Sequence, residues 1–191
     1  MRRGVVASPR LDRGAISCDN GGSFNLCAVE MPEATARKTH IYVVRNSRIH
    51  GRGVFAGRTI RKGTCIVEYR GERISVREAE RRPDSDPDNP YHTFLFELND
   101  GRVIDASVHG NAARWINHSC DPNCEPFEDE DGRVFIEARR TIKKGEELAY
   151  DYKLSLAGRI TTKIKSAYGC RCGASGCRGT MLDGRGPRAP R

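Results

Sequence analysis

Three cysteines stand within eight residues near the C-terminal end of the chain, at Cys170, Cys172 and Cys177. Thiolates in so dense a C-x-C-x4-C pattern suit the tetrahedral, sulfur-rich coordination that structural zinc prefers. A closed site of this kind needs four ligands, so a further side chain must come from elsewhere in the chain. Cys120 and Cys124 are the two candidates. The pattern therefore predicts one structural Zn²⁺.

A second group of side chains that could take part in chemistry is the pair Tyr150 and Tyr152. Residues two apart project from the same side of an extended strand. The two rings are therefore either core aromatics with solvated hydroxyls or one wall of a narrow aromatic channel. Such a channel suits a lysine side chain, because it can remove water and orient the amine once its proton has left.

Asn117 and His118 follow a short stretch of helical character, residues 111–116. A side-chain amide and an imidazole at such a corner can hold a carboxylate or the edge of a purine. Gly51 and Gly53 predict a turn in which both glycines are free to take positive φ. No long strand precedes this Gly-x-Gly and no long helix follows it, which excludes a dinucleotide-binding fold.

In this order and spacing, residues 114–120, 147–152 and 170–177 resemble the SET-domain protein lysine methyltransferases, including the post-SET zinc segment that follows the domain in many members. The resemblance covers about residues 40–183. Within the family, residues 103–114 look closest to the trithorax and mixed-lineage-leukaemia branch.

The resemblance implies a fold that is mostly β with a few short helices, in which small curved β-sheets surround a threaded pseudoknot. The SET domain would span residues 40–155 and the post-SET zinc segment residues 166–183. The activity implied is transfer of a methyl group from S-adenosyl-L-methionine to a lysine of a basic, histone-like protein.

Roles for individual residues also come from the resemblance. Tyr152 takes the catalytic position, and Tyr150 takes the position that tunes the product, where a tyrosine implies mainly monomethylation. Cys120 takes the place of the fourth zinc ligand. Phe94 stands where many members have a tyrosine near the cofactor. The full set of expected cofactor contacts is His50, Gly51, Arg52, Gly53, Phe94, Asn117, His118 and Arg171.

Two other readings remain open. One is a catalytically weak, zinc-stabilised SET module that binds a lysine-bearing tail or nucleic acid. Degenerate members of the family tend to lose the residue that corresponds to Tyr152, which this chain keeps. The other is a methyltransferase of small molecules, which would need an open pocket instead of a narrow channel.

Composition bounds the rest. The 191 residues suit one domain with tails, and no apolar run is long enough to span a membrane. Dense cysteines without a secretory signal favour a reducing, intracellular compartment. The protein is expected to be a monomer. The net charge of +8 looks scattered, so nucleic-acid contact has no basic stripe in its favour. The 26 arginines against 7 lysines suggest a GC-rich genome, and a bacterium is one candidate source. The protein would then be cytoplasmic, or nuclear and chromatin-bound if eukaryotic.

Local patterns predict the elements that must position these groups. Strands are expected at residues 41–44, 54–56 and 64–69, hairpins around residues 99–101 and 131–132, and a helix capped by Ser75 with Glu78 in the capping box. Residues 58–63 and 140–145 echo each other, which we interpret as two similar turn-to-strand junctions.

The remaining segments carry weaker expectations. Residues 1–36 read as a disordered or mis-assigned extension, with Met31 an alternative start, and residues 184–191 as a disordered basic tail. Cys18 and Cys27 form a tail pair, and Cys65 reads as a small buried apolar residue. Acidic clusters at residues 84–88 and 125–131 would suit a basic peptide.

Overall fold

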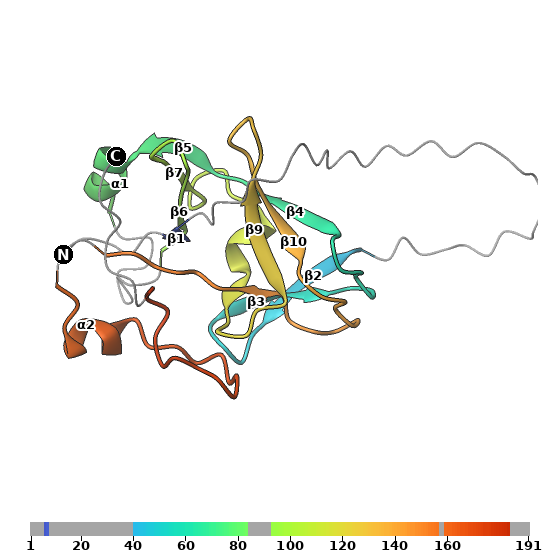
Figure 1. Cartoon of the computed structure of the whole chain (residues 1–191). Coiled ribbons are helices and arrows are strands. Elements are labelled where there is room, and N and C mark those ends of the chain that lie inside the picture. The colour runs from blue at the N-terminus through green and yellow to red at the C-terminus, as the bar shows by residue number, and fades with distance from the viewer. Residues whose placement is uncertain (1–5, 8–39, 84–92, 157–158, 184–191) are drawn as a thin grey trace, which may run out of the picture.

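Short strands dominate the computed structural model, which describes residues 6–7, 40–83, 93–156 and 159–183 (Figure 1). The expectation of a mostly β fold with a few short helices is confirmed for these residues. The strands are β1 (Val6–Ala7), β2 (Tyr42–Asn46), β3 (Arg52–Ala56), β4 (Cys65–Tyr69), β5 (Glu72–Ser75), β6 (Leu95–Glu97), β7 (Arg102–Asp105), β8 (Asn117–His118), β9 (Cys124–Glu128), β10 (Val134–Ala138) and β11 (Ala149–Tyr150). The helices are α1 (Val76–Arg81), the 3-10 turn η1 (Ala112–Trp115) and α2 (Thr162–Ala167).

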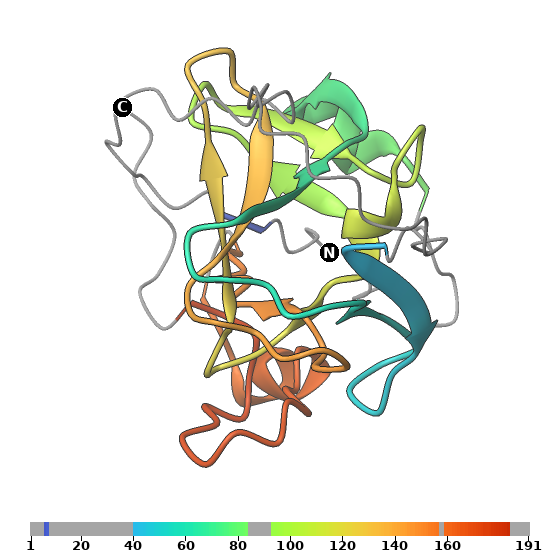
Figure 2. The same ribbon diagram turned by 90° about the vertical axis from the view of Figure 1, so that its right-hand side faces the viewer.

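The strands form small separate sheets. Their orders are β1-β6-β7-β5, β4-β10-β9, β11-β8 and β2-β3. β10 lies between β4 and β9, and all five of its side chains are buried, as its central position requires. Figure 2 shows these sheets wrapped around a shared interior. That interior is one main apolar cluster, with Phe96, Ile116 and Leu148 at its centre.

The locally encoded elements form where the sequence predicts them. Gly101 and Gly132 take positive φ in the turns of the β6–β7 and β9–β10 hairpins. The Ser75 side chain accepts a hydrogen bond from the backbone N–H of Glu78 at 3.2 Å, which caps α1.

The parallel pair of β8 and β11 brings distant chemistry together. Asn117 lies opposite Ala149, and His118 lies opposite Tyr150. The two strands are only two residues long, so the pair depends on the packing around it more than on its own ladder.

Some expectations differ from the structure or fall outside it. Val6 and Ala7 form β1, which pairs with β6 in parallel and was not predicted. Cys65 is half-buried in β4, so it is not the fully buried residue that was expected. The rest of residues 1–36, with Cys18 and Cys27, the acidic cluster at residues 84–88 and the tail at 184–191 lie outside the described residues. Within the described residues, no helix is long and apolar enough to cross a membrane.

Candidate active site

Tyr152 lies where the β8–β11 pair ends. Its hydroxyl donates a hydrogen bond to the carbonyl oxygen of Ile116 at 2.7 Å. Its ring centroid lies 4.9 Å from that of Tyr150 and 5.3 Å from that of His118. The structure therefore brings together the two predicted tyrosines and the predicted Asn-His corner.

Tyr69 is a third tyrosine at this position, which the sequence analysis treated only as part of a strand. It projects from β4, and its hydroxyl donates to the carbonyl of Phe94 at 3.0 Å. Burial raises its pKa far above the usual range, and the neighbouring Tyr152 adds to that rise. The signal that could have found it is a tyrosine at the end of a strand whose central residues, Ile66 and Val67, are apolar.

All three phenols stay protonated at neutral pH. Burial is the main cause of the raised pKa of Tyr150, with Tyr69 and Tyr152 as further contributors. Burial also raises the pKa of Tyr152. These hydroxyls can therefore orient a ligand by hydrogen bonding, but they are too weakly acidic to act as phenolate bases.

Asn117 connects the glycine turn to β8. Its side-chain amide donates to the carbonyl of Arg52 at 2.9 Å and to Oε1 of Glu147 at 2.8 Å, with a longer contact of 3.3 Å to the carbonyl of His50. Ser47 also donates to Glu147, at 2.7 Å. Glu147 therefore anchors both ends of the turn, a role that the sequence analysis missed.

The two glycines of the turn serve different needs. Gly51 takes φ +44° and has open space around it. Gly53 is buried, and a side chain there would collide with Oε1 of Glu147. The expectation of positive φ is therefore met at Gly51 but wrong at Gly53, where close packing is what requires glycine.

Phe94 packs edge-on against Trp115, with ring centroids 5.1 Å apart. The guanidinium groups of Arg52 and Arg114 lie over the same Trp115 ring, at 5.1 and 4.7 Å. Within the described residues, Nε of Arg114 is the buried side-chain nitrogen without a hydrogen-bond partner. An unsatisfied donor beside aromatic rings is a group that a polar cofactor such as S-adenosylmethionine can satisfy, so these residues are compatible with that cofactor.

The four predicted zinc ligands converge. The Sγ atoms of Cys120, Cys170, Cys172 and Cys177 all lie within 4.8 Å of one another. Cys120 Sγ lies 3.8 Å from that of Cys170 and 4.0 Å from that of Cys177. Tetrahedral zinc with bonds of about 2.3 Å would separate its sulfurs by about 3.8 Å, so the cluster fits the metal. Cys124 is fully buried in β9 and is not part of the cluster.

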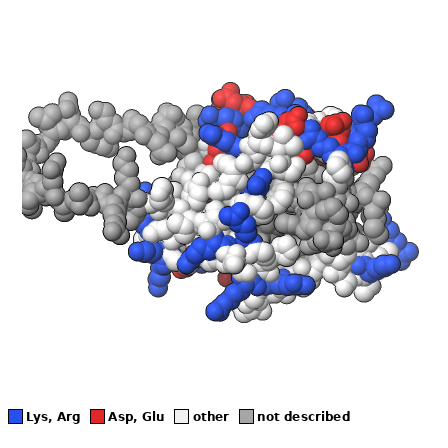
Figure 3. Space-filling model, turned by 180° about the vertical axis from the view of Figure 1, so that it is seen from behind, with Lys and Arg blue, Asp and Glu red and all other residues white. Residues whose placement is uncertain are grey.

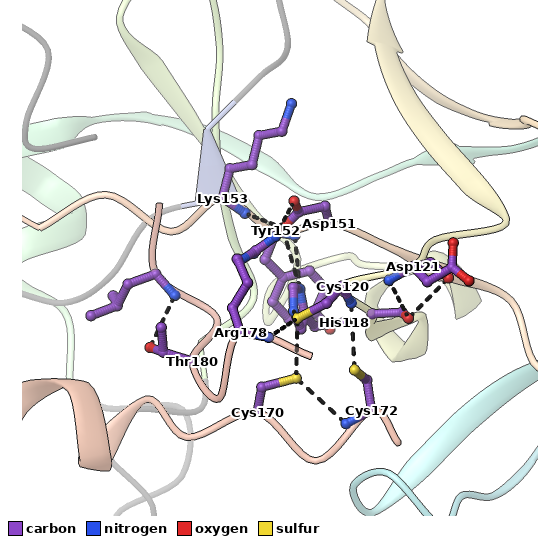
Figure 4. A network of polar contacts seen from close by, with 12 residues as sticks. His118, Cys120, Asp121, Asp151, Tyr152, Lys153, Cys170, Cys172, Arg178 and Thr180 are labelled. Carbon is purple, nitrogen blue, oxygen red and sulfur yellow. Dashed lines mark hydrogen bonds and ion pairs between the residues drawn. The ribbon is translucent and has the colours of Figure 1, made fainter. Parts of the chain in front are cut away.

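His118 links the cysteine cluster to the tyrosines (Figure 4). Its Nδ1 accepts a hydrogen bond from the backbone N–H of Tyr152 at 3.1 Å. The proton of the neutral ring therefore resides on Nε2, which faces Sγ of Cys120 at 3.4 Å. Burial lowers the pKa of His118 to about 4. His118 is thus neutral, and its Nε2–H can donate to Cys120, as residues around metal ligands often do.

Arg178 fastens the cysteine segment to the tyrosine motif. Its guanidinium donates two hydrogen bonds to the Asp151 carboxylate, at 2.9 and 2.8 Å. Its backbone N–H also points at Sγ of Cys120, at 3.4 Å. The sequence analysis did not single out either residue, because a contact 27 positions apart leaves no local pattern.

Arg171 is the predicted contact that the structure does not bring to the others. Its side chain is exposed between Cys170 and Cys172 and makes no hydrogen bond or ion pair within the described part of the chain.

Comparison with known proteins agrees with this geometry. A family model described as the SET domain matches residues 51–153. The histone-lysine N-methyltransferase trr of Drosophila melanogaster is 42% identical over 147 residues, which is 75% of this chain and 6% of that protein. The human histone-lysine N-methyltransferase 2D is 40% identical over 151 residues, 77% of this chain and 3% of that protein.

A solved structure described as ctPRC2 in an autoinhibited conformation bound to S-adenosylmethionine aligns with a TM-score of 0.52 and 35% identity, over 60% of this chain and 15% of that one. The chain belongs to the SET-domain family. It spans less than a tenth of the length of the first two of these methyltransferases.

Proposed function

We propose that this chain is an S-adenosyl-L-methionine-dependent protein-lysine N-methyltransferase acting on a basic, histone-like protein. The observation that carries the proposal is the position of the Tyr152 hydroxyl, held by Ile116 among buried aromatic rings. The relatives in the SET family are named histone-lysine methyltransferases, which supports the same substrate class.

The cofactor supplies a methyl group on a sulfonium, ready for transfer to a nucleophile. The lysine must arrive as a neutral amine. A channel walled by Tyr69, Tyr150 and Tyr152 would remove water from the side chain, which lowers the pKa of its ammonium. Because these phenols remain protonated, the proton leaves to solvent or another acceptor, and Tyr152 then orients the lone pair by hydrogen bonding.

The residues that would hold the cofactor are the expected contacts given above other than Arg171, which the structure does not bring to the rest. Asn117 supports their arrangement by fixing the carbonyls of His50 and Arg52. We also propose that Cys120, Cys170, Cys172 and Cys177 hold one structural Zn²⁺, for which their sulfur separations are suitable.

The finer properties of the enzyme are proposed as follows. The product is mainly monomethyl-lysine, because the Tyr150 hydroxyl occupies space near the amine. The SET domain spans residues 40–155 and the zinc segment residues 166–183, and the protein acts as a monomer. A nuclear, chromatin-bound location is favoured, because the relatives described above are histone methyltransferases of animals, which gives no support to a bacterial origin.

Labelled methyl transfer tests this proposal. The metal-replete chain is incubated with S-adenosylmethionine carrying a radioactive methyl group and with mixed histones. Incorporation into protein that maps to lysine after digestion is the expected result. Binding of the donor without transfer would instead indicate a weak module, and label in small molecules alone would indicate a different substrate class. Either of these results contradicts the proposal.

A further inference from the structure

The repeated hexapeptide places two basic segments side by side. Residues 58–63 read R-T-I-R-K-G and residues 140–145 read R-T-I-K-K-G. Ile60 and Ile142 form an antiparallel bridge in which each backbone N–H donates to the other's carbonyl, at 2.9 and 2.8 Å. The two segments run beside one another across the face that Figure 2 turns toward the viewer.

The contacts around this bridge repeat in matched pairs. The N–H of Gly63 donates to the carbonyl of Ala138, and the N–H of Gly145 donates to that of Ala56, both at 2.8 Å. The two glycines have nearly the same φ, +78° and +87°. The hexapeptides also share one burial pattern, with only the central isoleucine buried. The two copies are therefore related by a local two-fold axis through the Ile60–Ile142 bridge.

This symmetry gathers positive charge on one face. We call the six exposed cations of the two hexapeptides the basic two-fold face: Arg58, Arg61, Lys62, Arg140, Lys143 and Lys144. Arg140 pairs with Glu146 at 2.9 Å. The other five make no ion pair within the described part of the chain. The expectation that the positive charge is scattered is therefore incomplete, because the fold concentrates part of it.

Acidic side chains are distributed unevenly over the molecule. Figure 3 shows Asp and Glu mainly along the upper edge, where Lys and Arg lie among them, whereas the lower part carries mostly Lys and Arg. A groove of about 480 Å³ also opens beside the first hexapeptide, lined by Arg58, Thr59, Arg61 and Thr64 together with the apolar Ile41 and Ile60. Guanidinium groups, ammonium groups and hydroxyls are among the donors with which proteins contact phosphate oxygens.

We infer that the basic two-fold face binds the phosphate backbone of duplex DNA without reading its sequence. The two strands of a duplex run antiparallel and are related by local two-fold axes. Cations paired about a protein two-fold can therefore meet phosphates of both strands in equivalent positions. An acidic peptide has no such symmetry. The inference stands apart from the proposed function, because it uses none of the tyrosine or cysteine residues.

The experiment measures binding of a fluorescent duplex of about 20 base pairs as a function of salt, with the whole chain. Each phosphate contact adds about 0.9 to the slope of log Kd against log salt. Neutralising four cations of the face should lower that slope by about 3.6 and weaken binding by at least roughly 30-fold at low salt. A matched variant that loses four exposed cations of α1 and α2 should lower the slope by less than about 1. The face variant is R61Q/K62Q/K143Q/K144Q and the control is R77Q/R81Q/K163Q/K165Q.

Three results would overturn the inference: no binding of the duplex by the unaltered chain, equal losses in both variants, or equally tight binding of polyglutamate. Melting temperature and methylation of a short peptide are measured alongside, and both should be unchanged in the face variant. If that variant melts early, the single substitutions R61Q and K143Q replace it. The two-fold relation predicts that these two weaken DNA binding equally, and clearly unequal losses would count against it.

Discussion

The hydroxyl of Tyr152 is the single group on which the proposed chemistry depends most. Tyr152→Phe keeps the ring but removes the hydrogen bond to Ile116. We expect kcat to fall by at least roughly 100-fold, while the Kd for S-adenosylmethionine changes by less than about 2-fold, because the hydroxyl acts on the amine in the transition state. Steady-state kinetics and calorimetry measure the two quantities.

Two other substitutions serve as a control and as a contrast for the Tyr152→Phe result. Tyr42 is half-buried in β2, and Tyr42→Phe, which removes its hydroxyl, should leave kcat unchanged. Asn117→Ala should show the opposite emphasis, with donor affinity lost first, because Asn117 holds the carbonyl of Arg52 in the glycine turn. A Tyr152→Phe variant with full kcat would remove Tyr152 from the catalytic role.

The hydroxyl of Tyr150 governs a different property, the number of methyl groups transferred. Tyr150 is buried against Tyr69 and Tyr152. Tyr150→Phe makes room beside the amine, so the ratio of dimethyl- and trimethyl-lysine to monomethyl-lysine should rise by about 5-fold or more, which corresponds to roughly 1 kcal/mol. Mass spectrometry of a methylated peptide measures the ratio. Efficient trimethylation by the unaltered chain would refute the monomethylation proposal.

The residues that sequence predicted and those that it missed differ in a physical way. The cysteine triplet and the tyrosine pair carry their signal in local spacing, and the structure brings both groups together. Glu147 and Arg178 act through partners 27 or more positions away. No short pattern records such contacts, so only the folded chain shows them.

Among the elements, the zinc segment permits the most direct prediction. Cys172→Ser leaves three thiolates in the cluster, so we expect bound zinc to fall from one per chain to well under half and methylation to fall at least roughly 10-fold with it. Elemental analysis and an activity assay on the same preparation measure both. Full activity in a strong chelator would show that the metal is dispensable.

The Asp151–Arg178 pair offers the matched comparison. Arg178→Gln removes a docking contact but no thiolate side chain. Because the Arg178 side chain is 37% exposed, the pair should contribute only about 1 kcal/mol. We therefore expect zinc to stay bound and kcat/KM to fall about 5-fold. Loss of zinc in this variant would mean that the pair holds the cluster itself together.

The same contrast between local and distant signals applies to elements. The two hairpins and the cap of α1 are encoded by adjacent residues and form as predicted. β1 was not predicted, because two residues carry no periodic signal and their partner β6 lies about 90 positions away. The β8–β11 pair leaves no local signal for the same reason, because its strands are two residues long and lie about 30 positions apart.

At the scale of the whole molecule, the SET fold brings three distant segments to one place and also produces the basic two-fold face. The repeated hexapeptides were visible in the sequence, but their reciprocal hydrogen bonds were not. Net charge alone therefore could not predict where the positive charge gathers.

Calorimetric titration with S-adenosylmethionine tests most directly whether the glycine turn, the β8–β11 pair and the cysteine cluster form one site. The account predicts that zinc-replete protein binds one donor molecule per chain and that removal of zinc by a chelator weakens this binding at least roughly 10-fold. Zinc-replete, folded protein that releases no heat with the donor and shows no rise in melting temperature would contradict the account.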